Sequence, residues 1–311
     1  MSEREIVCGD LGLAIDDLRS QGFRLDVIYP ADDPHTARLS RQGDCVRVTS
    51  SPDAAPPSDF LPHFAPEFVL TLAGGAPGEG RAGMLYRDLV PSRLGDRYIA
   101  SHISIPEGGP VADWVHFHRI ALQLIYVRRG WVRVVYEDQG EPFVMNEGDL
   151  VLQPPEIRHR VLESSPGLEV VEISSPALHA TLAEYQFDLP NGVNVGSTFG
   201  AQRFLHHVAA DCPWTRFDGG EAQETAVAEA TGGLAEVRTI RPAETSSVAF
   251  DRHQGELVFG FVLGGSATLE FRGSHQIGAA DAFVIPPDEA WSLEAVSRDF
   301  SLLHVVTARL D

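Results

Sequence analysis

The sequence predicts an all-β protein built from two tandem barrels, with a small α+β extension at its N-terminus. From about residue 97, short segments rich in β-branched and aromatic residues alternate with turns that contain glycine, proline or acidic residues, as in "LQLIYV", "WVRVVYE" and "LEVVEIS". The chain also carries 29 glycines and 21 prolines among its 311 residues, which favours many short strands over long helices. Seven or eight such strands are enough for one barrel or sandwich.

The strand pattern occurs twice, which predicts a tandem duplication. When "YVRRG" is superposed on "FVLGG", the segment "GDLVLQPPEIRH" aligns with "AADAFVIPPDEAW". The turn glycine and the following aspartate are 19 residues apart in the first copy (Gly130, Asp149) and 16 apart in the second (Gly265, Asp281). The difference is confined to one hairpin loop, so we expect two barrels of the same design.

Periodicity and composition divide the chain into five parts. Apolar residues at helical spacing predict a helix over 10–21, and "ALHATLAEY" (177–185) predicts another. The segment "SSPDAAPPSD" is typical of a linker. The predicted parts are a helix-plus-hairpin module at 1–50, a linker or extended segment at 51–90, the first barrel at 91–175, a connection at 176–229 and the second barrel at 230–311.

The net charge and the cysteines restrict the partners that we expect. The chain carries 24 basic and 44 acidic residues, a formal charge of −20, so it is not suited to nucleic acid or to anionic membranes. Cys8, Cys45 and Cys212 are odd in number and far apart, which supports neither a disulfide framework nor a cysteine-based zinc site. With no signal peptide and no apolar run long enough to span a membrane, we expect a cytoplasmic protein.

The segment "WVHFHRIALQLIYVRRG" (114–130) contains two histidines in a run that otherwise predicts strand. Residues i and i+2 of a strand point to the same face, so His116 and His118 present both imidazoles to one side. Two unpaired imidazoles inside a barrel would lose hydration, and two protonated ones would repel each other. A divalent metal ion shared by neutral imidazoles removes both penalties, and the pair is therefore a candidate metal site.

Further residues complete a motif that resembles the cupin superfamily. Gln123 follows His118 by five residues, and His159 follows the segment "PPEIR". A histidine pair, a side-chain oxygen, a turn glycine, then Gly-Asp, proline and a third histidine is similar to the two cupin motifs in both order and spacing. The resemblance covers about 90–175 and, more weakly, 230–311. It implies a bicupin, that is, two jelly-roll (double-stranded β-helix) barrels, of which the first binds a metal ion.

The resemblance implies four metal ligands, His116, His118, Gln123 and His159. The usual fourth ligand in the family is glutamate, whereas Gln123 can bind metal through its amide oxygen but brings no negative charge. Such a neutral set favours a divalent transition metal, with Fe(II) preferred and Zn, Ni, Co or Mn as alternatives, and offers no carboxylate to act as a base. Gln123 could equally hold a water molecule or the substrate.

The second barrel is not expected to bind a metal ion. The alignment leaves one plausible strong ligand at the corresponding positions, and a tryptophan would fill the space that a metal needs. The four aligned residues are Asp251, His253, Val258 and Trp291.

The resemblance implies an enzyme that acts on a small oxygen-bearing metabolite, with dioxygenase chemistry slightly preferred. A non-redox metal-dependent isomerase, cyclase or lyase is the second hypothesis, and a non-catalytic metabolite-binding protein is the third. Monomer and homodimer both remain open. The residues expected to line the pocket are Trp114, Tyr126, Gln153 and Arg158.

Overall fold

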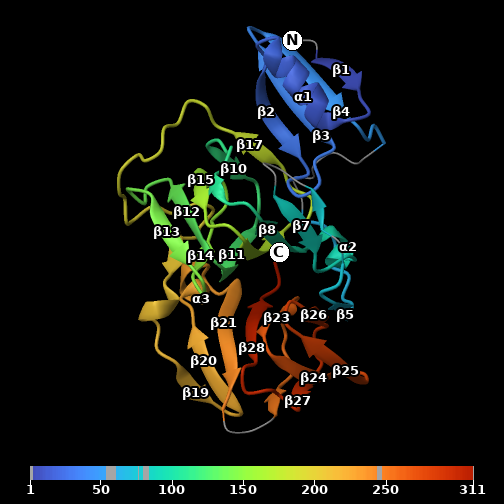
Figure 1. Cartoon of the computed structure of the whole chain (residues 1–311), viewed down its shortest axis with the longest axis vertical. Helices are drawn as coiled ribbons and strands as arrows, with labels where there is room; N and C mark the ends of the chain where they lie inside the picture. The colour runs from blue at the N-terminus through green and yellow to red at the C-terminus, as the bar shows by residue number, and fades with distance from the viewer. Residues whose placement is uncertain (1–2, 54–60, 76, 80–83, 244–246, 311) are drawn as a thin grey trace.

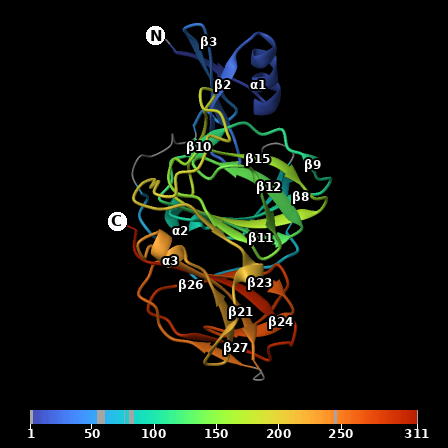
Figure 2. The same cartoon turned by 90° about the vertical axis from the view of Figure 1, so that its left-hand side faces the viewer.

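The computed structural model of the protein describes residues 3–53, 61–75, 77–79, 84–243 and 247–310. The chain forms a row of three bodies, with the N-terminal module at one end, the first barrel in the middle and the second barrel at the other end (Figures 1 and 2). The prediction of an all-β fold with two tandem barrels is confirmed. The central part of the predicted linker, residues 54–60, lies outside the described residues.

The N-terminal module packs one helix against a four-stranded sheet. The side chain of Asp10 accepts a hydrogen bond from the backbone N–H of Leu13, which caps the helix at its start. The helix buries Leu11, Ile15 and Leu18 against the sheet, as its apolar spacing predicts. The elements are β1 (Glu3–Val7), α1 (Leu11–Ser20), β2 (Arg24–Tyr29), β3 (Thr36–Arg41) and β4 (Asp44–Thr49), in the sheet order β1-β4-β3-β2.

The first barrel consists of two facing sheets. One has the order β10-β15-β12-β13, with β9 beside β15, and the other has the order β14-β11-β16-β8-β7-β6. The elements are β6 (Gly78–Glu79), β7 (Leu85–Asp88), α2 (Arg93–Asp96), β8 (Ile99–Ile105), β9 (Gly109–Pro110), β10 (His116–His118), β11 (Leu122–Arg129), β12 (Trp131–Tyr136), β13 (Phe143–Asn146), β14 (Leu150–Leu152), β15 (His159–Ser164) and β16 (Leu168–Ser175).

The second barrel repeats this arrangement. Its sheets have the orders β19-β20-β21-β28-β23-β26 and β22-β27-β24-β25. The elements are β19 (Thr215–Phe217), β20 (Gly220–Glu224), α3 (Val227–Ala230), β21 (Ala235–Pro242), β22 (Val248–Phe250), β23 (Val258–Gly264), β24 (Ser266–Glu270), β25 (Ser274–Gly278), β26 (Ala282–Ile285), β27 (Trp291–Glu294) and β28 (Ser301–Thr307).

The two aspartates that the sequence alignment pairs have the same structural role. One carboxylate oxygen of Asp149 accepts a hydrogen bond from the backbone N–H of Asn146 at 2.8 Å, and Asp281 accepts from Gly278 at 2.7 Å. The other oxygen of each aspartate binds a backbone N–H from a distant part of the chain. The same turn is therefore built in the same way in both barrels, which supports the duplication.

Segments outside the two predicted barrels add strands to their sheets. β5 (Val69–Thr71) pairs with β26 of the second barrel, and β18 (Leu205–His207) pairs with β14 of the first. A short 3₁₀ helix follows at Ala209–Asp211. In the described part of the chain, no helix combines the length and the apolar character that a membrane crossing requires.

The helix predicted at 177–185 is wrong. The segment instead contains β17 (Thr181–Ala183), which pairs antiparallel with β10 on one side and with β2 on the other. Both neighbouring strands would otherwise leave an edge of unpaired backbone groups, and satisfying these groups outweighs the local helical preference. β17 thereby joins the sheet of the N-terminal module to that of the first barrel (Figure 1).

The two barrels share a continuous apolar core along the faces of their larger sheets. Successive residues of a strand point to opposite faces. Alternate side chains of β11 therefore point into this shared core, and those between them point into the interior of the first barrel. Phe259 and Phe261 of β23 and Val305 of β28 are fully or nearly fully buried in the shared core. The residues of β11 in the shared core are Leu122, Leu124 and Tyr126.

The interior of the second barrel combines aliphatic and aromatic side chains. Phe250 pairs with Trp291 in the strand register, and their rings stack with centroids 3.8 Å apart. In the first barrel the corresponding register pairs His116 with His159. The residue in the place of His116 is therefore Phe250 and not Asp251, so the sequence alignment was shifted by one residue there. Two stacked rings occupy the position of two imidazoles.

Beside these rings, burial lowers the pKa of His304 to about 3, with the Arg238 guanidinium next to it as a second cause. The pKa of His304 in the folded state thus lies below its unfolded value of about 6.5. Its contribution to stability is therefore fully present above pH 6.5 and is lost as the pH falls from 6.5 towards 3. The unfolding free energy of the wild type should fall between pH 7 and pH 5, and about 2 kcal/mol of this fall should come from His304. In His304→Leu the fall should therefore be smaller by that amount. Urea unfolding at the two pH values measures this, and an unchanged difference contradicts it.

Candidate metal centre

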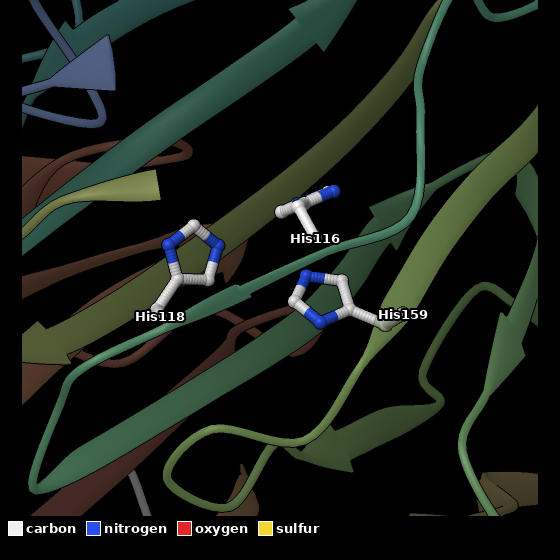
Figure 3. Close-up of side chains that lie close together, drawn as sticks. All are labelled: His116, His118 and His159. Atoms are coloured by element: carbon white, nitrogen blue, oxygen red, sulfur yellow. The ribbon is translucent and has the colours of Figure 1, made fainter. Parts of the chain in front are cut away.

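Three histidines from two adjacent strands meet inside the first barrel. His116 and His118 project from the same face of β10, and His159, the first residue of β15, lies opposite His116 in the antiparallel register. One nitrogen from each ring lies within 4.8 Å of the others, and all three side chains are buried (Figure 3). Within the described residues, this is the one cluster of three or more histidine, cysteine or acidic side chains at such a spacing.

Backbone carbonyl groups orient all three imidazoles. Each ring has its Nδ1 within hydrogen-bond distance of a carbonyl oxygen, which can only accept, so Nδ1 carries the proton and Nε2 is the nitrogen that can ligate. The carbonyl groups belong to Trp114, Ala180 and Ile157, at 2.7, 3.3 and 3.0 Å from His116, His118 and His159 respectively. Three buried neutral imidazoles held in this way fit a divalent transition metal ion.

Two glutamine side chains extend the cluster. The Gln153 amide nitrogen donates a hydrogen bond to Gln123 Oε1 at 2.7 Å and lies 3.1 Å from His159 Nε2. The Tyr136 hydroxyl donates to Gln153 Oε1 at 2.8 Å, and burial raises the pKa of this hydroxyl. The structure thus brings Gln123 and Gln153 to the cavity of the three histidines, where the Gln153 amide nitrogen donates both to Gln123 Oε1 and to His159 Nε2.

A carboxylate that the sequence analysis missed also faces this cluster. Glu172 of β16 accepts a hydrogen bond from the Gln123 amide nitrogen at 3.0 Å and another from the Ser174 hydroxyl at 3.2 Å. The expected ligand set of three histidines and Gln123 contains no carboxylate, but Glu172 places one beside it. The signal was present, because Glu172 is in phase with Leu168 and Val170, whose side chains form the barrel interior, and a charge on that face is unusual.

The cluster opens into a cavity of about 90 Å³ inside the barrel. The polar side chains described above that line it are His116, His118, His159, Gln123, Gln153, Tyr136 and Glu172, and Tyr86 joins them. The rest of its wall is mainly aliphatic. The aliphatic wall includes Ile103, Ile105, Ile125, Val132, Val134, Val161, Leu168 and Val170.

A second cavity of about 30 Å³ borders the first. Both are lined by Tyr86, His118 and Glu172, and the second is closed by Ala31 and Asp32 from the end of the N-terminal module. This small cavity thus lies between the histidine cluster and the end of the N-terminal module.

Three residues expected in the pocket lie elsewhere. Tyr126 points into the core shared by the two barrels, where its hydroxyl contacts Thr239 and burial raises its pKa to about 12. Trp114 packs against the core of the N-terminal module. Arg158 forms an ion pair with Glu137 and lies over the rings of two phenylalanines, Phe117 and Phe187.

The position of Tyr126 follows from strand parity. Gln123 points inward, so residues 125 and 127 share its face and residue 126 takes the opposite one. The same rule, applied from Gln123, could have excluded Tyr126 from the pocket.

Solved structures with a similar fold include a protein described as glyoxylate-induced from Pseudomonas aeruginosa (TM-score 0.59, 12% identity, 84% of this chain and 96% of that one). A salicylate 1,2-dioxygenase from Pseudaminobacter salicylatoxidans gives a TM-score of 0.58 at 14% identity, over 79% and 86% of the two chains. A Bacillus subtilis oxalate decarboxylase variant gives 0.52 at 12% identity, over 82% and 78%.

No protein-family model and no curated protein sequence matches the chain. The likeness therefore lies in the fold alone: the chain has the two-barrel fold of these structures, in agreement with the two tandem barrels that the sequence motifs implied. The histidine cluster lies in the N-terminal barrel of the pair.

The placement of Tyr126 can be checked by substitution. We expect Tyr126→Phe to lower the free energy of unfolding by about 1 kcal/mol, because it removes one buried hydrogen bond, and to leave the metal content unchanged. Urea unfolding and plasma mass spectrometry measure the two quantities. A loss of bound metal would show that Tyr126 contributes to the site.

Proposed function

We propose that the protein is an enzyme with one mononuclear metal centre in its first barrel, which acts on a small oxygen-bearing molecule. The observation that carries the proposal is the set of three buried imidazoles, oriented by backbone carbonyl groups and opening into an enclosed cavity. His116, His118 and His159 would hold the metal ion, and Gln123 is the proposed fourth ligand. A bound metal ion would supply an electrophilic centre with positions for a chelating substrate.

The cavity wall supports the kind of substrate proposed. Polar groups are gathered around the histidines, and much of the remaining wall is aliphatic, which suits a molecule with oxygen atoms at one end and an apolar remainder. The barrel interior excludes bulk water, and the side chains of Gln123 and Gln153 offer hydrogen-bonding groups that can orient the substrate. We propose Gln153 as a pocket residue on this basis.

Dioxygenase chemistry with Fe(II) is our preferred reaction class. It is supported by a ligand set rich in histidine and without a directly placed carboxylate, and by the similar fold of a salicylate 1,2-dioxygenase. The second candidate is a non-redox reaction with Zn, Ni, Co or Mn. For this candidate the carboxylate of Glu172, close to the cavity, is the supporting observation.

Metal content and oxygen uptake test the proposal together. Protein purified without chelators or an affinity tag should contain close to one equivalent of a transition metal by plasma mass spectrometry. Iron combined with oxygen uptake, in the presence of diketones, thiols or catechols, supports the dioxygenase. Zinc, nickel, cobalt or manganese without uptake supports the non-redox enzyme, and the absence of any metal contradicts both.

The ligand assignment has its own test. We expect the double substitution His116→Ala and His118→Ala to lower the metal content at least tenfold, because two of three imidazoles are lost. His253→Ala, in the second barrel, is the matched control and should retain the metal. Full retention by the double variant would refute the assignment.

A further inference from the structure

Four side chains form one continuous hydrogen-bonded chain along the wall of the cavity. The Tyr136 hydroxyl donates to Gln153, Gln153 donates to Gln123, and Gln123 donates to Glu172, over distances of 2.8, 2.7 and 3.0 Å. The two glutamines are 1% and 2% exposed, so these hydrogen bonds are shielded from bulk water. The chain therefore connects the histidine cluster to a carboxylate that is not itself part of it.

The carboxylate at the end of the chain fixes the direction of every hydrogen bond. An ionised Glu172 can only accept, so Gln123 must turn its amide nitrogen to it and its oxygen the other way. Gln153 must then turn its nitrogen to that oxygen, and its own oxygen accepts from the Tyr136 hydroxyl. Without an acceptor at residue 172, Gln123 could present either its oxygen or its nitrogen to the histidines.

The oxygen of Gln123 and one imidazole of the histidine cluster share a hydrogen-bond donor. Gln123 Oε1 and His159 Nε2 both approach the amide nitrogen of Gln153, at 2.7 and 3.1 Å. An oxygen in this place can ligate a metal ion, whereas an amide nitrogen, which carries two hydrogens, cannot. The orientation imposed by the carboxylate is thus the one that suits a metal site.

The pair Gln123 and Glu172 also explains why residue 123 is not the expected glutamate. The two residues lie on the adjacent strands β11 and β16 and both face the barrel interior. Glutamate at 123 would place two carboxylates about 3 Å apart in a buried position, where like charges disfavour each other. The negative charge has moved by one side chain, and glutamine fills the position next to the metal.

We propose that Glu172 is a positioning residue of the metal centre, which holds the Gln123 oxygen towards the three histidines and adds a carboxylate behind Gln123. A second carboxylate, that of the buried Asp113, lies 3.5 Å from His116 Nδ1. The inference rests on the proposed function, because it concerns the same metal site. It adds that the carboxylate acts through Gln123 and need not touch the metal.

The test is cobalt(II) binding to the full-length chain freed of metal. We expect Glu172→Leu, which removes the acceptor but suits the aliphatic wall, to weaken cobalt binding by about 10- to 100-fold, as is typical for residues that orient a metal ligand. Glu172→Gln keeps an acceptor oxygen in the same place and should lie between Glu172→Leu and the wild type. Competition with a chelating indicator gives the dissociation constants, and the visible spectrum of bound cobalt reports a change in its ligands.

Two further variants separate positioning from general damage. Glu163→Gln makes the same change of charge at a half-exposed site on β15 and should leave the cobalt affinity within twofold of the wild type. The double exchange Gln123→Glu and Glu172→Gln keeps one carboxylate and the hydrogen bond between the two side chains, with donor and acceptor exchanged. Its cobalt affinity should therefore be restored relative to Glu172→Leu. Thermal unfolding of each metal-free variant verifies that it is folded.

The outcomes distinguish the inference from the proposed function. If the wild type binds cobalt but Glu172→Leu binds it within twofold, with the same spectrum, the inference is refuted and the metal centre stands. An exchange variant that stays as weak as Glu172→Leu also refutes it. If the wild type itself binds no cobalt, the proposed function fails and the inference falls with it.

Discussion

The strict alternation of side chains along β11 and β16 is the constraint on which the structure depends. One face of these strands is buried in the core between the barrels, and the other forms the wall of the metal cavity. A shift of register by one residue would exchange Gln123 for an apolar neighbour and Glu172 for Val171 or Ile173. The packing of the second barrel thus determines which polar groups reach the site.

This dependence gives the second barrel a role even though its own interior is closed. Its larger sheet covers the outer face of β11 with Phe259 and Phe261, and its inside is filled by the stacked pair Phe250 and Trp291. One copy carries the polar cluster, and the other has an aromatic pair at the corresponding positions. The second barrel, which lacks the histidine cluster, thus stabilises strand β11 of the first barrel, and this strand positions Gln123.

How far the sequence could predict the structure depended on whether the signal was local. The two barrels and the cluster of His116, His118 and His159 follow from short-range spacing, so they could be predicted. Glu172 and Tyr126 could also have been placed, by continuing the strand alternation from Leu168 and Val170 and from Gln123. The strand at 181–183 could not be predicted, because the two edges that it pairs with come from residues far away in the sequence.

The pairing of β17 with both β10 and β2 has a thermodynamic consequence. β10 carries two of the histidines, and through β17 its backbone is hydrogen-bonded to the sheet of the N-terminal module. Separation of that module would leave β17 bound on one side only and would loosen the strand that presents the imidazoles. If the site holds a metal ion as proposed, attachment of the module and occupation of the site are linked equilibria, in which each stabilises the other by the same free energy.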